Sequence, residues 1–221
     1  MVDHLALDRV EAHVETIGGQ AYIFGLAWYS AEDIKAKDRW TKAKKFAQER
    51  EFDLFLTYQA QYAAGLLEDY QGGAFSAAAA FAGQFDDDNI LGLFALEHGR
   101  YWVFAKTDDL IDGDGDTVFD DLEEALDHFY DLADLGGFDR FLSSQELEDL
   151  EYERQTLDAF LPGPGKPFVF SAQNQLGDAL AISVHYGRNI QDLAKEKPRV
   201  AAAIAAVILI PVLGFVVTSL I

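Results

Sequence analysis

The sequence predicts an α+β domain followed by one C-terminal transmembrane helix. Short apolar runs typical of strands are mixed with amphipathic stretches at helical spacing, a pattern of α+β proteins that leaves α/β open as the alternative. The last 22 residues, 200–221, carry no charged side chain. As a helix rising 1.5 Å per residue this run is about 33 Å long, enough to cross the hydrocarbon core of a bilayer.

These observations divide the 221 residues into three segments. Residues 1–187 form the α+β domain, 188–199 a basic juxtamembrane linker or helix, and 200–221 the transmembrane helix. The first segment has the length of one well-packed domain and is short for two. Cysteine is absent, so there is no disulfide framework, which fits a reducing compartment.

In the N-terminal part, apolar runs predict three strands, at 10–17, 20–28 and 52–58. Gly18 and Gly19 separate the first two runs, as in a hairpin turn. The second run is almost wholly apolar, which is typical of a strand buried on both faces. Before the third run, Ser30 is a suitable N-cap for a helix that continues to about Glu51.

The rest of the domain predicts further strands and helices separated by polar loops. The strands lie at 90–96, 100–106, 138–142 and 168–171, and the helices at 75–82, 121–135, 145–161 and 189–197. Two acidic stretches, 86–89 and 108–116, are expected to be loops, because Asp, Asn and Gly favour turns. The stretch 174–185 fits a strand as well as a helix.

Basic residues flank the apolar run on its N-terminal side only. They are Arg188, Lys195, Lys197 and Arg199. Lys and Arg stay on the cytoplasmic side of a membrane, so we expect the domain in the cytoplasm, held by a span from Val200 to Ile221 with a kink at Pro211. A buried core helix is the alternative, but it would show a polar face, and only Thr218 and Ser219 are polar here.

Small residues recur four positions apart at the start of the predicted span. They are Ala201, Ala202, Ala203, Ala205 and Ala206. Such spacing lets transmembrane helices approach closely, so a homo-oligomer is expected. The alternative is that alanine is a tolerated apolar filler.

The charge of the chain is strongly negative and unevenly distributed. The net charge is −21, of which residues 188–221 contribute +2, leaving −23 for residues 1–187. Residues 86–158 alone hold 23 acidic and four basic side chains, net −19. Such a surface repels nucleic acid and attracts basic proteins, so nucleic-acid binding is not expected. A purely solvated, solubilising face is the alternative reading.

Two stretches are candidates for docking a partner by charge. The basic one is the lysine-rich helix around Lys42, Lys44 and Lys45, the only basic surface of the domain. The acidic one begins at the triplet Asp86, Asp87 and Asp88. Complementary charge steers encounter and sets specificity, so a partner is expected to meet one of these surfaces.

No catalytic, cofactor-binding or metal site is predicted, and we do not expect an enzyme. Carboxylates at Asp112, Asp114, Asp116 and Glu123 occupy EF-hand positions one, three, five and twelve. However, Thr117 stands where that loop needs glycine, so calcium binding is not expected. The five histidines are scattered, and no phosphate-binding glycine motif is present.

The order of short motifs resembles the cytoplasmic part of the PilO-type proteins of type IVb pilus biogenesis. The matching pieces are Gly25-Leu-Ala-Trp28, the basic helix with Phe52-Asp53 after it, Gly72-Gly-Ala-Phe-Ser-Ala-Ala-Ala79, Phe94-Ala-Leu-Glu-His-Gly-Arg-Tyr-Trp-Val103, Asp108-Asp-Leu-Ile111, Asp114-Gly-Asp116 and Gly136-Gly-Phe-Asp139. They cover about residues 10–165 together with the position of the span.

The resemblance implies a bitopic inner-membrane scaffold of a type IVb pilus assembly platform, which docks cytoplasmic motor parts to the membrane machine. The implied partners are the pilus assembly ATPase and polytopic or bitopic platform proteins. By analogy with type II secretion it also implies an RNase-H/actin-like domain without nucleotide binding. Members of that family continue past the membrane, so this chain is expected to be a short form or a fragment. The alternatives are a tail-anchored adaptor or an actin-like nucleotide-binding protein unconnected with pili.

Overall fold

The computed structural model describes residues 11–67, 74–85, 88–161 and 182–183, which form three sheets and their covering helices. The predicted α+β domain is therefore confirmed. Met1–Val184 is one compact unit, and the second unit, His185–Ile221, lies outside the described residues. The latter holds the predicted basic flank (Arg188, Lys195, Lys197, Arg199) and the predicted span with Val200, Pro211 and Ile221. In the described parts of the chain, each helix is too short or too polar to cross a bilayer.

The hairpin sheet consists of β1 (His13–Ile17), β2 (Gln20–Phe24) and the short β6 (Phe75–Ser76). β1 and β2 pair antiparallel, whereas β6 joins β2 in parallel. Gly18 and Gly19 both have positive φ, 58° and 87°. A two-residue hairpin turn favours such angles at both positions, so the predicted hairpin and its turn are confirmed.

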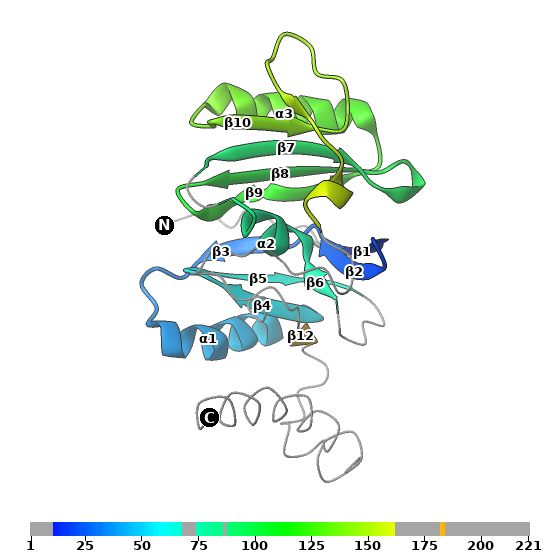
Figure 1. The fold of residues 1–221 in the computed structure, drawn as a ribbon. Helices are drawn as coiled ribbons and strands as arrows, with labels where there is room; N and C mark the ends of the chain where they lie inside the picture. Colours follow the sequence, from blue (N-terminus) through cyan, green and yellow to red (C-terminus); the bar gives the residue numbers. More distant parts are fainter. Residues whose placement is uncertain (1–10, 68–73, 86–87, 162–181, 184–221) are drawn as a thin grey trace, which may run out of the picture. The chain divides into compact units, whose positions relative to one another are not determined.

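The α1 sheet consists of β3 (Ala27–Ser30), β4 (Leu54–Tyr58), β5 (Gln61–Gly65) and β12 (Ile182–Ser183), in the order β12-β4-β5-β3. Its pairs are all antiparallel. Helix α1 (Ala36–Glu49) covers one face and buries Ala43 and Ala47 against β4 and β5 (Figure 1).

Two boundaries predicted in this region are wrong. The apolar run 20–28 is two strands in two different sheets, because the backbone turns at Gly25 with a φ of 76°. Ser30 is no helix cap. It ends β3, paired with Gln61, and α1 begins six residues later. The cross-strand pairing of β3 with β5 thus overrides the local capping preference of serine.

The α3 sheet consists of β7 (Ile90–Ala95), β8 (Tyr101–Thr107), β9 (Leu110–Phe119), β10 (Arg140–Ser143) and β11 (Glu153–Arg154). β7, β8 and β9 form an antiparallel meander, and β10 and β11 continue the sheet in parallel on the other side of β7. Helix α3 (Leu122–Leu135) links β9 to β10 and lies along one face of this sheet (Figure 1). It starts at Asp121, whose carboxylate caps two backbone N–H groups, and stops at Gly136, as predicted.

The composition of the acidic stretch 108–116 predicted a loop, and this prediction is wrong. Most of the stretch belongs to β9. Gly115 permits this, since a Cβ atom there would lie 2.6 Å from the Cβ of Ala105 on β8. The predicted helix 145–161 is also wrong. This segment contains β11 and a short 3-10 helix, η2 (Leu157–Ala159). It is bound to β10 by backbone hydrogen bonds, such as the one that the Gln155 N–H donates to the Ser143 carbonyl.

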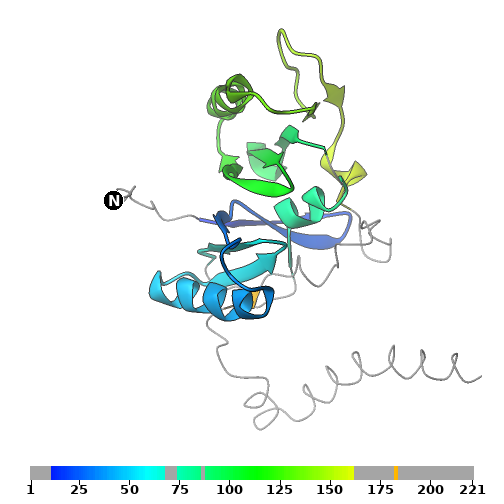
Figure 2. The ribbon, with the colours of Figure 1, turned by 90° about the vertical axis from the view of Figure 1, so that its left-hand side faces the viewer.

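The largest hydrophobic cluster lies between the sheets. It joins β2, β4 and β8 with α2 (Ala77–Ala82), a helix whose six residues are all buried. Ser76 caps α2, as its hydroxyl accepts from the Ala79 N–H at 3.1 Å. Separate clusters lie between α3 and its sheet and between α1 and its sheet; in Figure 2, α3 is seen nearly along its axis and α1 from the side.

Candidate docking surfaces

The outward side of α3 carries a row of unpaired carboxylates. Ala125, Phe129 and Leu132 face the sheet, so the helical repeat turns the acidic residues to solvent. These exposed residues, here called the acidic face of α3, are Glu123, Glu124, Asp127, Asp131 and Asp134. Within the described chain, no ion pair reaches them. Leu135 follows directly and is 82% exposed.

The basic residues of the acidic region are mostly engaged within the domain. Arg100 binds Glu15 at 2.8 Å, and the buried Lys106 donates to the Phe85 carbonyl at 2.9 Å. Arg140 is held by carboxylates on both sides. Because these cations serve internal contacts, they leave the carboxylates of α3 uncompensated.

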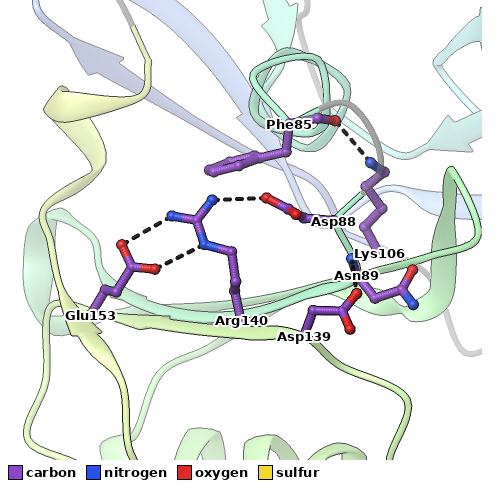
Figure 3. A network of polar contacts seen from close by, with 7 residues as sticks. All are labelled: Phe85, Asp88, Asn89, Lys106, Asp139, Arg140 and Glu153. Atoms are coloured by element: carbon purple, nitrogen blue, oxygen red, sulfur yellow. Dashed lines mark hydrogen bonds and ion pairs between the residues drawn. The ribbon is translucent and has the colours of Figure 1, made fainter.

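Figure 3 shows the network around Arg140. Its Nε and Nη2 donate to the two carboxylate oxygens of Glu153 at 2.8 and 3.0 Å, and Nη1 donates to Asp88 at 2.9 Å. The guanidinium also lies over the Phe85 ring, 5.2 Å from its centroid. The hydrogen bond from Arg140 holds the pKa of Glu153 below its ordinary value.

This network involves one residue of the predicted acidic docking triplet Asp86, Asp87 and Asp88. Asp88 is an internal partner of Arg140, which ties the start of β7 to β10. Asp86 and Asp87 lie outside the described residues. The exposed acidic surface in the described residues is therefore on α3. The sequence places this helix in the acidic region 86–158 but does not single it out as a docking site.

The predicted basic docking residues lie on different sides of α1. Lys42 and Lys45 are exposed, and Lys44 is half-buried. Lys45 pairs with Glu49 at 3.4 Å. Since successive helical residues are turned by about 100°, Lys44 lies about 160° around the helix from Lys42. The three lysines therefore do not form one patch.

The core contains a buried carboxylate, that of Asp116, which is 3% exposed. Oδ1 accepts from the Gly25 N–H at 2.9 Å and the Trp102 Nε1 at 2.8 Å. Oδ2 accepts from the Leu26 N–H at 3.1 Å and the Trp28 Nε1 at 2.9 Å. This carboxylate connects the turn between β2 and β3 to β8 and β9, and thus the sheets to one another.

The sequence did not predict that Asp116 is buried and joins the sheets, because there it stands out only as a possible calcium ligand at EF-hand position five. Its carboxylate points inward to four N–H donors, while Asp114 is exposed on the same strand and Glu123 begins α3. In the described parts of the chain, no cluster of acidic and histidine side chains has the arrangement of a metal site. The expectation that calcium does not bind stays a prediction.

Burial raises the pKa of Asp116, and its four N–H donors offset part of this rise. A carboxyl group whose pKa is higher in the folded state binds its proton more tightly there, so its contribution to stability falls as the pH rises from the ordinary value of 3.8 through the raised pKa. The measurement is the free energy of unfolding of the native chain and of Asp116→Asn, from denaturant titrations at several pH values. We expect the difference, native minus variant, to fall as the pH rises through this range. A pH-independent difference would contradict the shift.

The structure thus defines an acidic α+β domain in which α1 and α3 cover different sheets and carry opposite charge. No protein-family model matches the chain, and no curated protein matches it. Among solved structures, it is similar to the cytoplasmic domain of BfpC, with a TM-score of 0.52 and 21% sequence identity. The alignment covers 66% of this chain and 89% of that domain, which shows a shared fold.

Proposed function

We propose that this protein is a bitopic inner-membrane scaffold of a type IVb pilus assembly platform, related to those of type II secretion. The observation that carries the proposal is the fold shared with nearly all of the BfpC cytoplasmic domain, since BfpC is a type IVb pilus biogenesis protein. The motif order of the PilO-type proteins supports it independently. The predicted span would hold the domain at the cytoplasmic side of the membrane.

The order of the α3 sheet supports the finer assignment to an RNase-H/actin-like fold. An antiparallel meander, β7-β8-β9, is followed by α3 and by a strand that returns in parallel to β7. The proposed function requires no catalysis, and the buried carboxylate of Asp116 is occupied in joining the sheets.

The acidic face of α3 is the surface proposed to dock the motor. Its five carboxylates lie on one side of a single helix and lack cationic partners in the described chain, so a basic partner surface would gain their attraction. The exposed Leu135 at the end of the helix provides an apolar contact beside them. The proposed partner is the pilus assembly ATPase, with polytopic or bitopic platform proteins bound in or near the membrane.

Reversing two charges of this face is expected to weaken recovery of the assembly ATPase at least about ten-fold in pull-downs from membranes. The variant is Asp127→Lys with Asp131→Lys. Exposed helix residues contribute little to stability, so the thermal unfolding midpoint should change little. The matched control is Glu32→Lys with Asp33→Lys, two exposed carboxylates outside α3 that alter the net charge equally.

Equal recovery of the ATPase by both variants, at low and at high salt, would remove α3 as the docking site. Recovery of no pilus component by the native chain would instead favour the tail-anchored adaptor. A bound nucleotide in the purified protein would favour the actin-like nucleotide-binding alternative.

A further inference from the structure

Helix α1 has one side that is free of acidic residues. Lys37 and Lys44 are two turns apart and share this side, and Trp40 and Thr41 lie between them, so we call these four residues the basic stripe of α1. Lys45 lies at its margin. The acidic residues of the helix, Asp38 and Glu49, lie on the neighbouring side, about 60° and 80° around the helix from Thr41, and Glu49 pairs with Lys45. Among the described residues, neither Lys37 nor Lys44 forms an ion pair, so the stripe offers positive charge to a partner.

Trp40 differs from the other two tryptophans of the chain. The indoles of Trp28 and Trp102 are buried and donate to Asp116. Trp40 is 46% exposed, and its ring packs on Phe55 of β4, with the centroids 4.8 Å apart. An exposed tryptophan flanked by lysines has the chemistry of a membrane interface, where an amphipathic ring lies at headgroup level and lysines meet anionic lipid.

The stripe lies next to the place where the chain leaves the described domain. β12 pairs with β4 (Figure 1). The partner of Ile182 in this pairing is Phe55, the residue on which Trp40 packs. Only residues 184–199 separate β12 from the apolar run 200–221. Even fully extended, these 16 residues reach at most about 55 Å. A membrane-inserted run would thus hold α1 close to the lipid surface at high effective concentration.

The basic residues of the domain are concentrated in and next to α1, although only Lys37 and Lys44 of them belong to the stripe. Seven of the thirteen basic residues within 1–187 occur between positions 35 and 50. They are Lys35, Lys37, Arg39, Lys42, Lys44, Lys45 and Arg50. Residues 86–158, with net −19, are repelled by an anionic bilayer. The basic flank 188–199 would meet the same leaflet as the stripe.

We propose that the basic stripe of α1 binds an anionic lipid surface, with Trp40 at the level of the headgroups. The inference rests on the membrane attachment in the proposed function and adds an orientation to it. With α1 on the lipid, repulsion of the acidic stretch favours orientations that keep the acidic face of α3 away from the bilayer and open to a partner. An anionic bilayer fits better than an acidic protein, because the adjoining tail leads to an apolar run and the exposed side chain is tryptophan.

The test uses the full chain reconstituted in vesicles whose acyl chains carry bromine, which quenches tryptophan at the membrane surface. One set contains phosphatidylcholine alone and the other also phosphatidylglycerol. We expect clearly stronger quenching in the anionic vesicles, and loss of this difference in Trp40→Phe. One lysine near an anionic surface is worth about five-fold in partition. Lys37→Glu with Lys44→Glu should therefore lower the lipid-bound fraction of α1 strongly and bring quenching to the zwitterionic level.

The matched control is Lys42→Glu with Arg154→Glu, which makes the same charge change at exposed sites outside the stripe and should retain quenching. Equal quenching in both lipids, or equal loss in both double variants, would overturn the inference. A Trp40 signal that depends on protein concentration but not on lipid would indicate a second copy on the stripe, and would overturn it too.

Flotation with vesicles after alkaline carbonate treatment reports the membrane span separately. A chain that floats while Trp40 is not quenched leaves the proposed function standing and refutes the stripe. A chain that does not float refutes the span. The stripe is then refuted as well if added anionic vesicles quench Trp40 no more than zwitterionic ones.

Discussion

Replacing Asp116 by alanine is expected to lower the free energy of unfolding by about 4 kcal/mol. The change removes the acceptor of four N–H groups, two from the backbone at Gly25 and Leu26 and two from indoles. A buried donor left without an acceptor costs roughly 1–3 kcal/mol, and relief of the buried negative charge offsets part of the sum.

The measurement is a urea titration of the full chain in detergent, followed by tryptophan fluorescence. This signal is suited to the question because Trp28 and Trp102 both contact the substituted carboxylate. The matched control is Asp114→Ala, an exposed carboxylate on the same strand, which should change stability by less than about 0.5 kcal/mol. A loss below about 1 kcal/mol for Asp116→Ala would show that the carboxylate does not hold the sheets together.

Replacing Phe81 by alanine is expected to cost about 3–5 kcal/mol, through the cavity that it leaves. Phe81 lies on α2 and is fully buried. Its ring contacts five others, with centroids 4.8 to 5.6 Å away: those of Phe85, Phe94, Trp102, Phe104 and Phe160. These rings come from separate parts of the chain, so they cannot collapse onto the vacated volume without moving the α3 sheet or α2.

The same denaturant titration measures this effect, with Phe81→Leu as the comparison. Leucine keeps most of the apolar volume, so we expect a loss of about 1.5 kcal/mol or less. Equal stability of the alanine and native proteins would mean that α2 is not the packing centre of the largest cluster. Equal losses for alanine and leucine would point to ring geometry rather than cavity volume as the cause.

The sequence by itself predicted those elements whose signals are local. The Gly18-Gly19 hairpin needs two residues that tolerate positive φ, and glycine supplies both. Helix α3 has an apolar side at helical spacing and a glycine stop, so neighbouring residues were enough to predict it. The α+β class and the acidity of residues 86–158 required only composition and pattern.

Only the tertiary structure decided the roles of the charged side chains. Asp88 and Asp116 look alike in the sequence, yet one binds Arg140 across 52 positions and the other accepts from Gly25 across 91. The pairing of the strands determines which distant residues become such partners. The glycine- and aspartate-rich stretch forms a strand because it pairs with β8, where Gly115 leaves room for Ala105. Local propensity carries no information on contacts between distant segments, so the buried carboxylate and the lack of ion pairs on the acidic face of α3, within the described residues, emerged only from the folded chain.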